Sequence, residues 1–326
     1  CYLKDINQIG ACRVCLVEIK GAKALQPSCV YPVSEGLEVY TNTAKVREAR
    51  KGVVELLLSN HPSDCLNCVR NGSCELQDLA HQMGIRKNRF IGEQSTFPVD
   101  ERSVAIVRDP NKCVYCRRCE AVCSKVQGVS ILGGIGRGFN STVGPAFGHA
   151  LDDINCTLCG QCVNVCPVGA LAEKDDTDKV LAVINDPSKF VIVQTAPSIR
   201  ATLGEAFGMH IGTNVEGKMV AALRRLGFDK VFDTDYAADL TIMEEANELI
   251  ERVQNGGTLP MITSCSPGWI KYCEHYYPEQ IPHLSSCKSP QQMFGAVMKT
   301  YYAEKMGIDP KDMVVVGIMP CTAKKF

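Results

Sequence analysis

The sequence has no apolar run long enough to cross a bilayer. Its most apolar segments, "KVLAVIND" (179–186) and "DMVVVGIMP" (312–320), are short and typical of strands. It also lacks an excess of charge, since 35 Lys and Arg residues against 36 Asp and Glu residues give a formal net charge of −1. Because no strongly basic face is implied, nucleic acid is not expected as a partner. Neither a starting methionine nor a signal-peptide pattern is present, and we expect the natural N-terminus to lie upstream of Cys1.

Cysteine, by contrast, is abundant, with 19 residues in a chain of 326. A chain of this length with 45% apolar residues can build its own core and does not need a dense disulfide framework. Many of the cysteines stand in tight C-x2-C runs, and neighbours at that spacing converge on one metal more readily than they pair across a fold. We therefore expect metal sites and a reducing compartment, the cytosol.

The pattern along the chain predicts four regions. Residues 1–46 alternate short apolar stretches with turns, as in a small β-rich unit, and a helix is expected over 44–60. The second region, 47–100, includes the rest of that helix and then, from 61, a cysteine-bearing loop with a short helix. The third, 101–184, contains two C-x2-C-x2-C-x3-C runs, separated by the glycine-rich loop "GGIGRGFNSTVGPAFG". Residues 185–326 alternate strands and helices, which indicates an α/β layer with a mostly parallel sheet. Strands are expected there at 189–198, 228–235, 258–265 and 313–320.

The first two cysteine groups each leave two metals open on spacing alone. Cys1, Cys12, Cys15 and Cys29 suit a [2Fe–2S] cluster on a β-rich scaffold, whereas a zinc site would prefer two C-x2-C pairs and only one is present. The second group, with three cysteines and a histidine, can hold zinc or a [4Fe–4S] cluster, and we favour the cluster because the chain carries other cluster patterns. Its members are His61, Cys65, Cys68 and Cys74.

The two C-x2-C-x2-C-x3-C runs are the strongest local pattern. In two-cluster ferredoxins the fourth cysteine of each run binds the other cluster. One [4Fe–4S] cluster is therefore expected on Cys113, Cys116, Cys119 and Cys166. The second is expected on Cys156, Cys159, Cys162 and Cys123. A series of clusters forms a relay for single electrons, which requires a donor or an acceptor at its end.

Longer motifs resemble known families. The segment "HPSDCLNCVRNGSCELQDLA", with the [2Fe–2S] pattern before it, resembles the N-terminal region of the large electron-input subunit of respiratory complex I, of NAD-dependent formate dehydrogenases and of modular [FeFe] hydrogenases. The segments "TSCSPGW" (263–269) and "MPCTAKKF" (319–326) resemble two of the three cysteine motifs that hold the H-cluster in [FeFe] hydrogenases. "QTAPSIR", "MEEANELIERV" and "LSSCKSPQQMFG" are similar to that family as well.

The resemblance implies a multidomain α+β and α/β architecture. Its expected parts are a truncated β-grasp [2Fe–2S] ferredoxin-like unit (1–46), a [4Fe–4S] unit with one histidine and three cysteine ligands (47–100), a bacterial 2[4Fe–4S] ferredoxin-like unit (101–184) and the N-terminal part of the hydrogenase domain (185–326). The implied H-cluster is a [4Fe–4S] cubane bridged by a cysteine to a two-iron subsite. The third motif, which supplies its remaining two cysteines, is absent from these 326 residues, and we expect the C-terminal part of the domain to lie downstream.

The same resemblance implies roles for single residues. Cys321 is expected to bind the cubane, with Cys265 as a second ligand and Ser266 as a proton relay, although a strict positional alignment reverses those two. Lys324 resembles a lysine that donates to a cyanide, with an exposed lysine as the alternative. The subsite loop and pocket are matched by Ala196, Pro197, Ser198 and Met319, and the proton path by Glu245, Glu248, Arg252 and Ser285.

A simpler structural role is the alternative for the glutamate-rich helix and for two of the cysteines. A glutamate-rich helix that places Glu245, Glu248 and Arg252 on one face is, taken alone, more often a solvated surface. Cys273 and Cys287 have no assigned role and are interpreted as small buried thiols.

The expected function is the catalytic subunit of a cytosolic [FeFe] hydrogenase, which interconverts protons, electrons and H2. The Ser-Pro form of "TSCSPGW" resembles members of multi-subunit NAD(P)-linked, electron-bifurcating complexes, so flavin- and NAD(P)-binding subunits and a small [2Fe–2S] subunit are the expected partners, with ferredoxin as the alternative. Two other functions are open: a non-catalytic relay or H2 sensor, and a complex I-like or formate dehydrogenase electron-transfer subunit.

Overall fold

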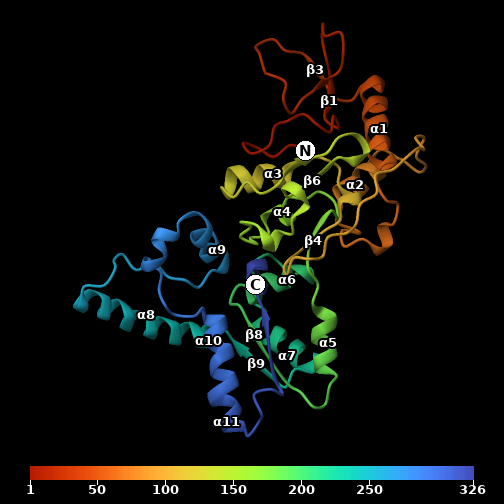
Figure 1. Cartoon of the computed structure of the whole chain (residues 1–326). Helices are drawn as coiled ribbons and strands as arrows, with labels where there is room; N and C mark the ends of the chain where they lie inside the picture. Colours follow the sequence, from red (N-terminus) through yellow and green to blue (C-terminus); the bar gives the residue numbers. More distant parts are fainter. The chain divides into compact units, whose positions relative to one another are not determined.

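The computed structural model describes all 326 residues. The chain forms two compact units, Cys1–Lys174 and Asp175–Phe326, which are shown in Figure 1 with the sequence coloured from red to blue. The division falls before the boundary expected at residue 185, because helix α5 (Thr177–Ile184) packs against the sheet of the second unit through Val180, Val183 and Ile184.

The first unit begins with the expected small β-rich region. Strand β1 (Leu16–Ile19) pairs antiparallel with β2 (Gln26–Pro27) on one side and with β3 (Val39–Tyr40) on the other. Alternate residues of β1, Val17 and Ile19, are buried, as expected for a strand with one covered face. The sheet is short, and loops carry all four cysteines of this region.

Helix α1 (Ala44–Ser59) confirms the helix predicted over 44–60. Thr43 caps its N-terminus by accepting a hydrogen bond from the Val46 amide at 3.2 Å. Val54 is fully buried among residues of helix α2 (Glu75–Gln82) and the segment near Val168. This packing fixes the loop between the two helices, which carries His61, Cys65 and Cys68.

The rest of the first unit consists of short elements around the two cysteine runs. Strand β4 (Ile106–Arg108) pairs antiparallel with β7 (Leu171–Glu173), and the glycine-rich loop folds into the hairpin β5 (Gly133–Ile135) and β6 (Thr142–Gly144). Each run enters a short helix. Those helices and the remaining turns are α3 (Arg118–Ala121), a π-helical turn (Val122–Val126), α4 (Gln161–Asn164) and 3-10 turns at Cys65–Asn67, Pro110–Lys112, Gly138–Asn140, Ala146–Gly148 and Leu151–Asp153.

The two cysteine runs share an unusual backbone. In the first run Tyr115 and Arg117 have φ values of 54° and 57°, and in the second Leu158 and Gly160 have φ values of 54° and 74°. These positions correspond, since each pair lies two and four residues after the first cysteine of its run. Left-handed conformations cost energy for residues other than glycine. The same turns in both runs therefore indicate a structural repeat that the cysteine spacing imposes.

The second unit is built on a parallel sheet of order β10-β8-β9, with strands Met313–Ile318, Phe190–Thr195 and Lys230–Asp233. Val191 and Val193 of β8 pack against helix α7 (Glu216–Leu226), while Ile192 faces Phe294 of α10 (Pro290–Val297) on the other side of the sheet. Figure 1 shows α7 and α10 on opposite sides of these strands. The α/β layer predicted for this region is confirmed. The other helices are α6 (Ile199–Ala206), α8 (Asp235–Asn255), α9 (Pro267–Tyr276), a 3-10 helix (Pro278–His283), a π-helical turn (Met298–Tyr302), α11 (Ala303–Met306) and a 3-10 turn (Thr322–Lys325).

Two strand predictions are wrong. The segment 179–186 lies mostly in helix α5, because Val180, Val183 and Ile184 recur at helical spacing and bury one face. The segment 258–265 forms one isolated bridge, Ile262 to Leu284, instead of a strand. Pro260 has no amide hydrogen to donate, and the Thr258 carbonyl accepts from Arg252 at 3.1 Å, so side chains take the place of a strand partner. Cys265 therefore does not follow a strand, whereas Cys321 follows β10 as predicted.

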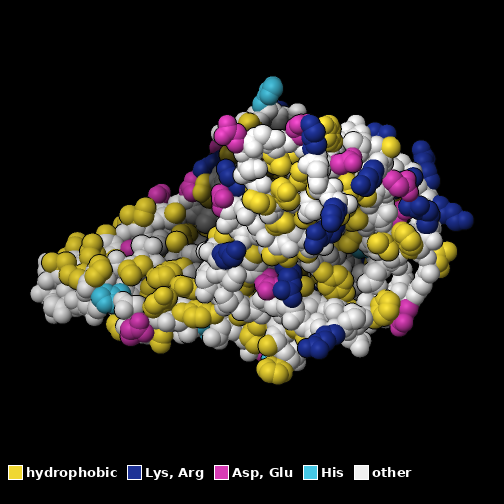
Figure 2. Space-filling view, turned by 90° about the horizontal axis from the view of Figure 1, so that it is seen from above, with side chains coloured by type: hydrophobic (Ala, Val, Ile, Leu, Met, Phe, Trp, Pro, Cys, Tyr) yellow, Lys and Arg dark blue, Asp and Glu magenta, His cyan; other side chains and the backbone are white.

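The surface agrees with the balanced composition. On the face shown in Figure 2, Lys and Arg side chains lie interspersed with Asp and Glu side chains, as the formal net charge of −1 leads one to expect. None of the helices combines the length and the apolar character that crossing a membrane requires.

Asp176 ties the end of the chain to α5, which gives a first prediction. It accepts from Lys325 at 2.6 Å and from Lys179 at 2.7 Å, and these bonds lower its pKa to about 2. Because the pKa of the folded state lies below that of the unfolded chain, the stabilisation is complete above about pH 4 and is lost as pH falls through about 2. With the side chain 34% exposed, we expect Asp176→Asn to cost about 1 kcal/mol or less at pH 7.

Thermal or urea unfolding at pH 7 and at pH 2 measures this cost. The difference between wild type and Asp176→Asn should be present at pH 7 and smaller at pH 2. Asp186→Asn is the matched control, since the Asp186 carboxylate accepts hydrogen bonds from Ser188 and lies near the same helix. An equal cost at both pH values would contradict the assignment to the ion pairs.

Candidate metal and catalytic sites

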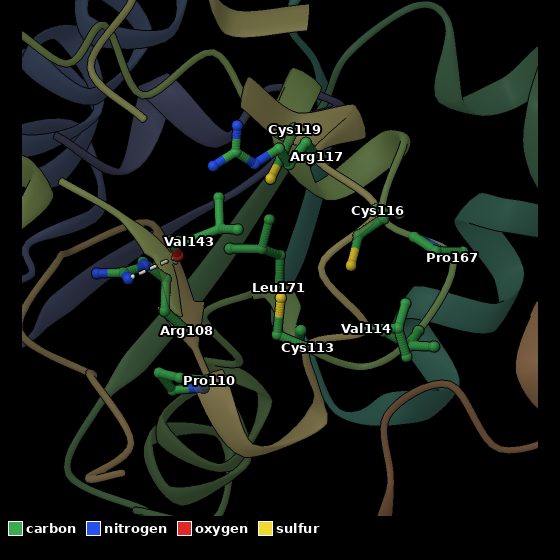
Figure 3. Close-up of a pocket in the computed structure, with 13 residues that line it drawn as sticks. Arg108, Pro110, Cys113, Val114, Cys116, Arg117, Cys119, Val143, Pro167 and Leu171 are labelled. Carbon is green, nitrogen blue, oxygen red and sulfur yellow. Dashed lines mark hydrogen bonds between the residues drawn. The ribbon is translucent and has the colours of Figure 1, made fainter. Parts of the chain in front are cut away.

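The two cysteine runs line two separate cavities. Figure 3 shows the first, with Cys113, Cys116 and Cys119 around it. In each cavity three cysteines come from one run and the fourth comes from the other run. The first is lined by Cys113, Cys116, Cys119 and Cys166. The second is lined by Cys123, Cys156, Cys159 and Cys162. The structure thus brings together the same two sets of four that the spacing predicts.

Burial dominates the electrostatics of these thiols. It raises the pKa of Cys113 and of Cys156 to about 11 and that of Cys162 to about 12, and the charges of neighbouring cysteines add to the rise. Several thiols packed in an apolar cavity cannot ionise together without a compensating positive charge. Bound iron supplies such a charge and takes thiolate ligands, so the donor set fits an iron–sulfur cluster.

Cys1, Cys12, Cys15 and Cys29 also line one cavity, together with apolar residues such as Leu57 and Val168. The N-terminal amine of Cys1 lies 3.7 Å from Cys12 Sγ. Burial and the neighbouring Cys15 raise the pKa of Cys29. All four expected donors of the first group therefore line one cavity, and such a set can hold an iron–sulfur cluster.

The fourth group surrounds a smaller cavity, lined by His61, Cys65, Cys68 and Cys74. His61 Nδ1 is buried without a hydrogen-bond partner, and burial together with the charge of Lys112 lowers the pKa of His61. A neutral imidazole with an unused nitrogen is well suited to bind a metal. At Gly169 a side chain would bring its Cβ to 2.5 Å from Cys68 Sγ, so glycine leaves that thiol free. These residues fit a metal group better than a loop with no ligand.

In the second unit, the segments "TSCSPGW" and "MPCTAKKF" lie against each other. Lys324 donates to the Cys265 carbonyl at 3.2 Å, and Lys271 of α9 lies 3.6 Å from the centre of the Phe326 ring. Cys265 is exposed and Cys321 is half-buried. Ser266 begins α9 as its N-cap residue, with extended backbone. Two segments that are remote in the sequence therefore form one surface that carries two thiols and a lysine.

The ends of the paired strands β8 and β10 adjoin this surface. The Ala196 amide donates to the Ile318 carbonyl at 3.0 Å, so Pro197 and Ser198 leave one strand next to the point where Met319 leaves the other. Pro197 and Ser198 are exposed, and Met319 is half-buried. The carboxyl ends of parallel strands are where α/β proteins place their chemistry.

Glu248 of α8 is the centre of a hydrogen-bonded network. It accepts from Arg252 Nη2 at 2.6 Å, from Ser285 Oγ at 2.9 Å and from the Ser286 amide at 3.1 Å. Burial acts to raise the pKa of Glu248, but the bonds from Arg252, Ser286 and Ser285 outweigh it and lower the pKa. Arg252 also donates to the Leu284 carbonyl at 2.7 Å, which holds the loop after the 3-10 helix against α8. This face of α8 is a built site and not a solvated surface.

The loop 284–287 connects this network to the cysteine segment. Ser264 Oγ donates to the Ser285 carbonyl at 3.0 Å and to the Cys287 carbonyl at 2.9 Å. Ser264, the residue before Cys265, thus contacts the loop that contains Ser285, and Ser285 donates to Glu248. Backbone carbonyls of the loop 284–287 therefore link the hydroxyl of Ser264 to the segment that contacts the Glu248 carboxylate.

Comparison with known proteins identifies the second unit. Residues 189–326 match the family described as the iron-only hydrogenase large subunit, C-terminal domain. These residues belong to the iron-only hydrogenase family. Ahead of the hydrogenase domain, residues 2–44 match a 2Fe-2S iron-sulfur cluster binding domain, 50–89 the NADH-ubiquinone oxidoreductase-G iron-sulfur binding region, and 103–172 the ferredoxin-like domain of NADH-quinone oxidoreductase subunit 3.

Curated relatives match all or part of this chain. The NADP-reducing hydrogenase subunit HndD of Solidesulfovibrio fructosivorans is 52% identical over 98% of this chain and 56% of its own length. Iron hydrogenase 1 of Clostridium pasteurianum is 43% identical over 100% of this chain and 57% of its own. The NADPH-Fe(3+) oxidoreductase subunit alpha of Geobacter sulfurreducens (strain DL-1 / KN400) is 34% identical, over only 53% of this chain and 20% of its own. The chain spans about half the length of the hydrogenase relatives.

Sequence reasoning missed one residue of the hydrogenase domain. Cys287, interpreted as a small buried thiol, is half-buried with Sγ 3.7 Å from Glu248 Oε2. Burial and the charges of Glu248 and Glu245 raise the pKa of Cys287. Its position two residues after Ser285 was the available signal. Cys273 does fit the plainer interpretation, since it is fully buried and donates to the Tyr277 carbonyl at 3.4 Å.

Glu245, which was expected in the proton path, is not part of the hydrogen-bonded network around Glu248. It lies one turn before Glu248 on α8 and is half-buried, but no hydrogen bond joins it to Glu248, Arg252 or Ser285.

Proposed function

We propose that this chain forms the electron relay and part of the H2-handling site of an [FeFe] hydrogenase catalytic subunit, which catalyses 2H⁺ + 2e⁻ ⇌ H2. The observation that carries the proposal is the meeting of the Cys265 and Cys321 segments beside the Glu248 network. In a hydrogenase domain, this arrangement supports a metal site at these thiols with protons delivered through the Glu248 network.

Four clusters are proposed for the first unit. A [2Fe–2S] cluster would be held by Cys1, Cys12, Cys15 and Cys29, in a truncated β-grasp fold. A [4Fe–4S] cluster would be held by His61, Cys65, Cys68 and Cys74, and two more by the two sets that line the paired cavities. Zinc is a weaker candidate for the first group, since a zinc site would prefer two C-x2-C pairs and only one is present. Thiols spaced around a cavity suit a multi-atom cluster instead.

At the hydrogenase domain we assign ligand roles to Cys321 and Cys265. The H-cluster, when bound, supplies the redox chemistry of H2. Ser266 would pass protons, Lys324 would donate a hydrogen bond to a cyanide ligand, and Pro197, Ser198 and Met319 would shape the pocket. Glu248, Ser285, Arg252 and Glu245 would deliver protons from the surface of α8.

The similarity to an NADP-reducing hydrogenase subunit supports an NAD(P)-linked complex with flavin-binding and small [2Fe–2S] partner subunits in the cytosol. Electrons would then pass between those subunits and the clusters of the first unit. Ferredoxin is the alternative partner. Purification of the native complex decides between the two by showing whether NAD(P)H-oxidising subunits accompany the chain.

The test of the function uses the matured holoenzyme. We expect infrared bands of CO and cyanide, and exchange of deuterium between D2 and water. Infrared bands without exchange would favour a sensor over an enzyme. The absence of both would overturn the proposal.

The histidine site gives a specific prediction. His61→Ala removes one of the four proposed ligands of this cluster. The iron and sulfide contents of the purified protein should therefore fall by the amount in one [4Fe–4S] cluster, while the other clusters remain. His61→Cys should restore the iron content but lower the reduction potential of that cluster, because a thiolate is negatively charged and imidazole is neutral. His81→Ala is the matched control, since His81 is exposed on α2. Unchanged iron in His61→Ala would show that His61 is not a ligand.

A further inference from the structure

Arg108 is an arginine buried between the two four-cysteine cavities. It is 7% exposed and lines both of them. Figure 3 shows it on β4 at the edge of the first cavity, with a hydrogen bond to Val143 of the glycine-rich hairpin. Its Nη2 donates to the Val143 carbonyl at 3.1 Å and its Nη1 to Asp100 Oδ2 at 3.2 Å. Burial lowers the pKa of Arg108, while the charges of Cys119 and Cys162, one from each cavity, raise it.

The surrounding charges leave Arg108 only partly neutralised. Its one acidic partner, Asp100, also accepts from Arg102 at 2.8 and 3.0 Å. One carboxylate therefore faces two guanidinium groups. Arg102 has 56% of its side chain exposed, against 9% for Arg108. Solvent screens the first charge far more than the second, so the net positive charge acts mainly on the cavities.

The glycine-rich hairpin is shaped around this side chain. A Cβ on Gly144 of β6 would overlap the terminal nitrogens of Arg108. Gly144 does not have a positive φ, so space and not backbone conformation requires glycine there. Gly134 of β5 makes the same allowance for Arg117, which is 48% exposed and lies 3.5 Å from Glu120. The loop that sequence analysis left without a role thus holds a buried arginine at the cavities.

We propose that the buried positive charge of Arg108 raises the reduction potential of the clusters in both cavities. The inference rests on the proposed function, since it needs clusters there. Each cluster takes up one electron from its neighbour in the relay and gains one negative charge. A fixed cation nearby stabilises the reduced form more than the oxidised form. Because Arg108 lines both cavities, its charge raises the two potentials together.

The test is a redox titration of the holoenzyme, followed by electron paramagnetic resonance. Arg108→Gln keeps a donor for Val143 but removes the charge. We expect the reduction equilibrium of both clusters to shift by about tenfold or more, which is about 59 mV toward lower potential for one electron. Arg108→Lys should retain most of the wild-type potential. The clusters proposed at Cys1 and at His61 should not shift and serve as internal references.

Two further variants make the outcome decisive. Arg102→Gln removes a guanidinium from the same carboxylate at an exposed position, and should shift the potentials less than Arg108→Gln does. Gly144→Ala pushes the Arg108 guanidinium aside without removing it, and should lower both potentials. If the Arg108→Gln protein assembles no clusters, the reduction potentials of the Gly144→Ala protein show whether the position of the Arg108 charge matters.

The failures of the two proposals are distinguishable. Iron and sulfide contents too low for two clusters in the wild-type cavities would refute the proposed function. Full cluster content with wild-type potentials in Arg108→Gln and Gly144→Ala would refute the role of Arg108 alone, and would leave it as a tie that holds the hairpin to β4.

Discussion

Cys321→Ala is expected to lower both H2 production and H2 oxidation by the matured enzyme by on the order of a thousandfold or more. A thousandfold loss corresponds to about 4 kcal/mol in the activation barrier, which is reasonable for the loss of a thiolate that holds the catalytic metal group. Cys321 is half-buried directly after β10, and its segment is fixed by the bond from Lys324 to Cys265. Iron content and the infrared bands of CO and cyanide should fall together with activity.

Cys273→Ala is the matched control for this experiment. Cys273 lies in the same unit and is fully buried, but it bonds only to the Tyr277 carbonyl at 3.4 Å. Its replacement should lower the thermal stability slightly and leave the specific activity of the folded protein unchanged. Retention of more than a tenth of the activity in Cys321→Ala, with normal iron, would show that Cys321 is not a ligand.

The same measurements separate the two assignments for positions 265 and 266. If Cys265 is the ligand, Cys265→Ala loses iron and Ser266→Ala loses only rate. If the positional alignment holds instead, Ser266→Ala loses iron and Cys265→Ala loses only rate. Ser266 caps α9 through its place in the chain and not through a side-chain hydrogen bond, so neither substitution should unfold the helix.

The local patterns predicted much of the fold, and the failures have identifiable causes. The helix at 44–60 and the strands at 190–195 and 313–318 were predictable because their apolar periodicity agrees with their packing. The segment 258–265 was not, because its carbonyls bond to side chains from elsewhere in the chain, such as Arg252. Periodicity cannot reveal such partners, since they depend on the tertiary fold.

Some features of the candidate sites were also predictable from the sequence, and others were not. Cysteine spacing predicted which four thiols line each paired cavity, because the repeat fixes both the turns and the crossing of the fourth cysteine. Spacing could not predict that Cys287 lies beside Glu248, or that Arg108 lies between the cavities. Neither residue was assigned a role from the sequence, because their contacts join elements that are distant in the sequence.

Glu248→Gln is expected to reduce turnover by about a hundredfold to ten-thousandfold, the usual range for the loss of a group that transfers protons. The amide keeps the size of the carboxyl group, but its single oxygen can accept from Arg252 or from Ser285 and not from both, and it cannot carry a proton at neutral pH. Iron content and infrared bands should therefore stay normal while H2 production falls. This combination differs from the Cys321 result, in which iron and activity are lost together.

Glu251→Gln on the same helix is the matched control, because Glu251 is exposed and takes no part in the network. Ser285→Ala should act in the same direction as Glu248→Gln, since it removes the hydroxyl that donates to Glu248 at 2.9 Å. A larger solvent deuterium isotope effect on turnover in Ser285→Ala than in wild type would indicate that proton delivery has become slower. Equal activity of the Glu248→Gln and Glu251→Gln proteins would mean that protons reach the thiols by another route, and that the network serves only to hold the loop 284–287 against α8.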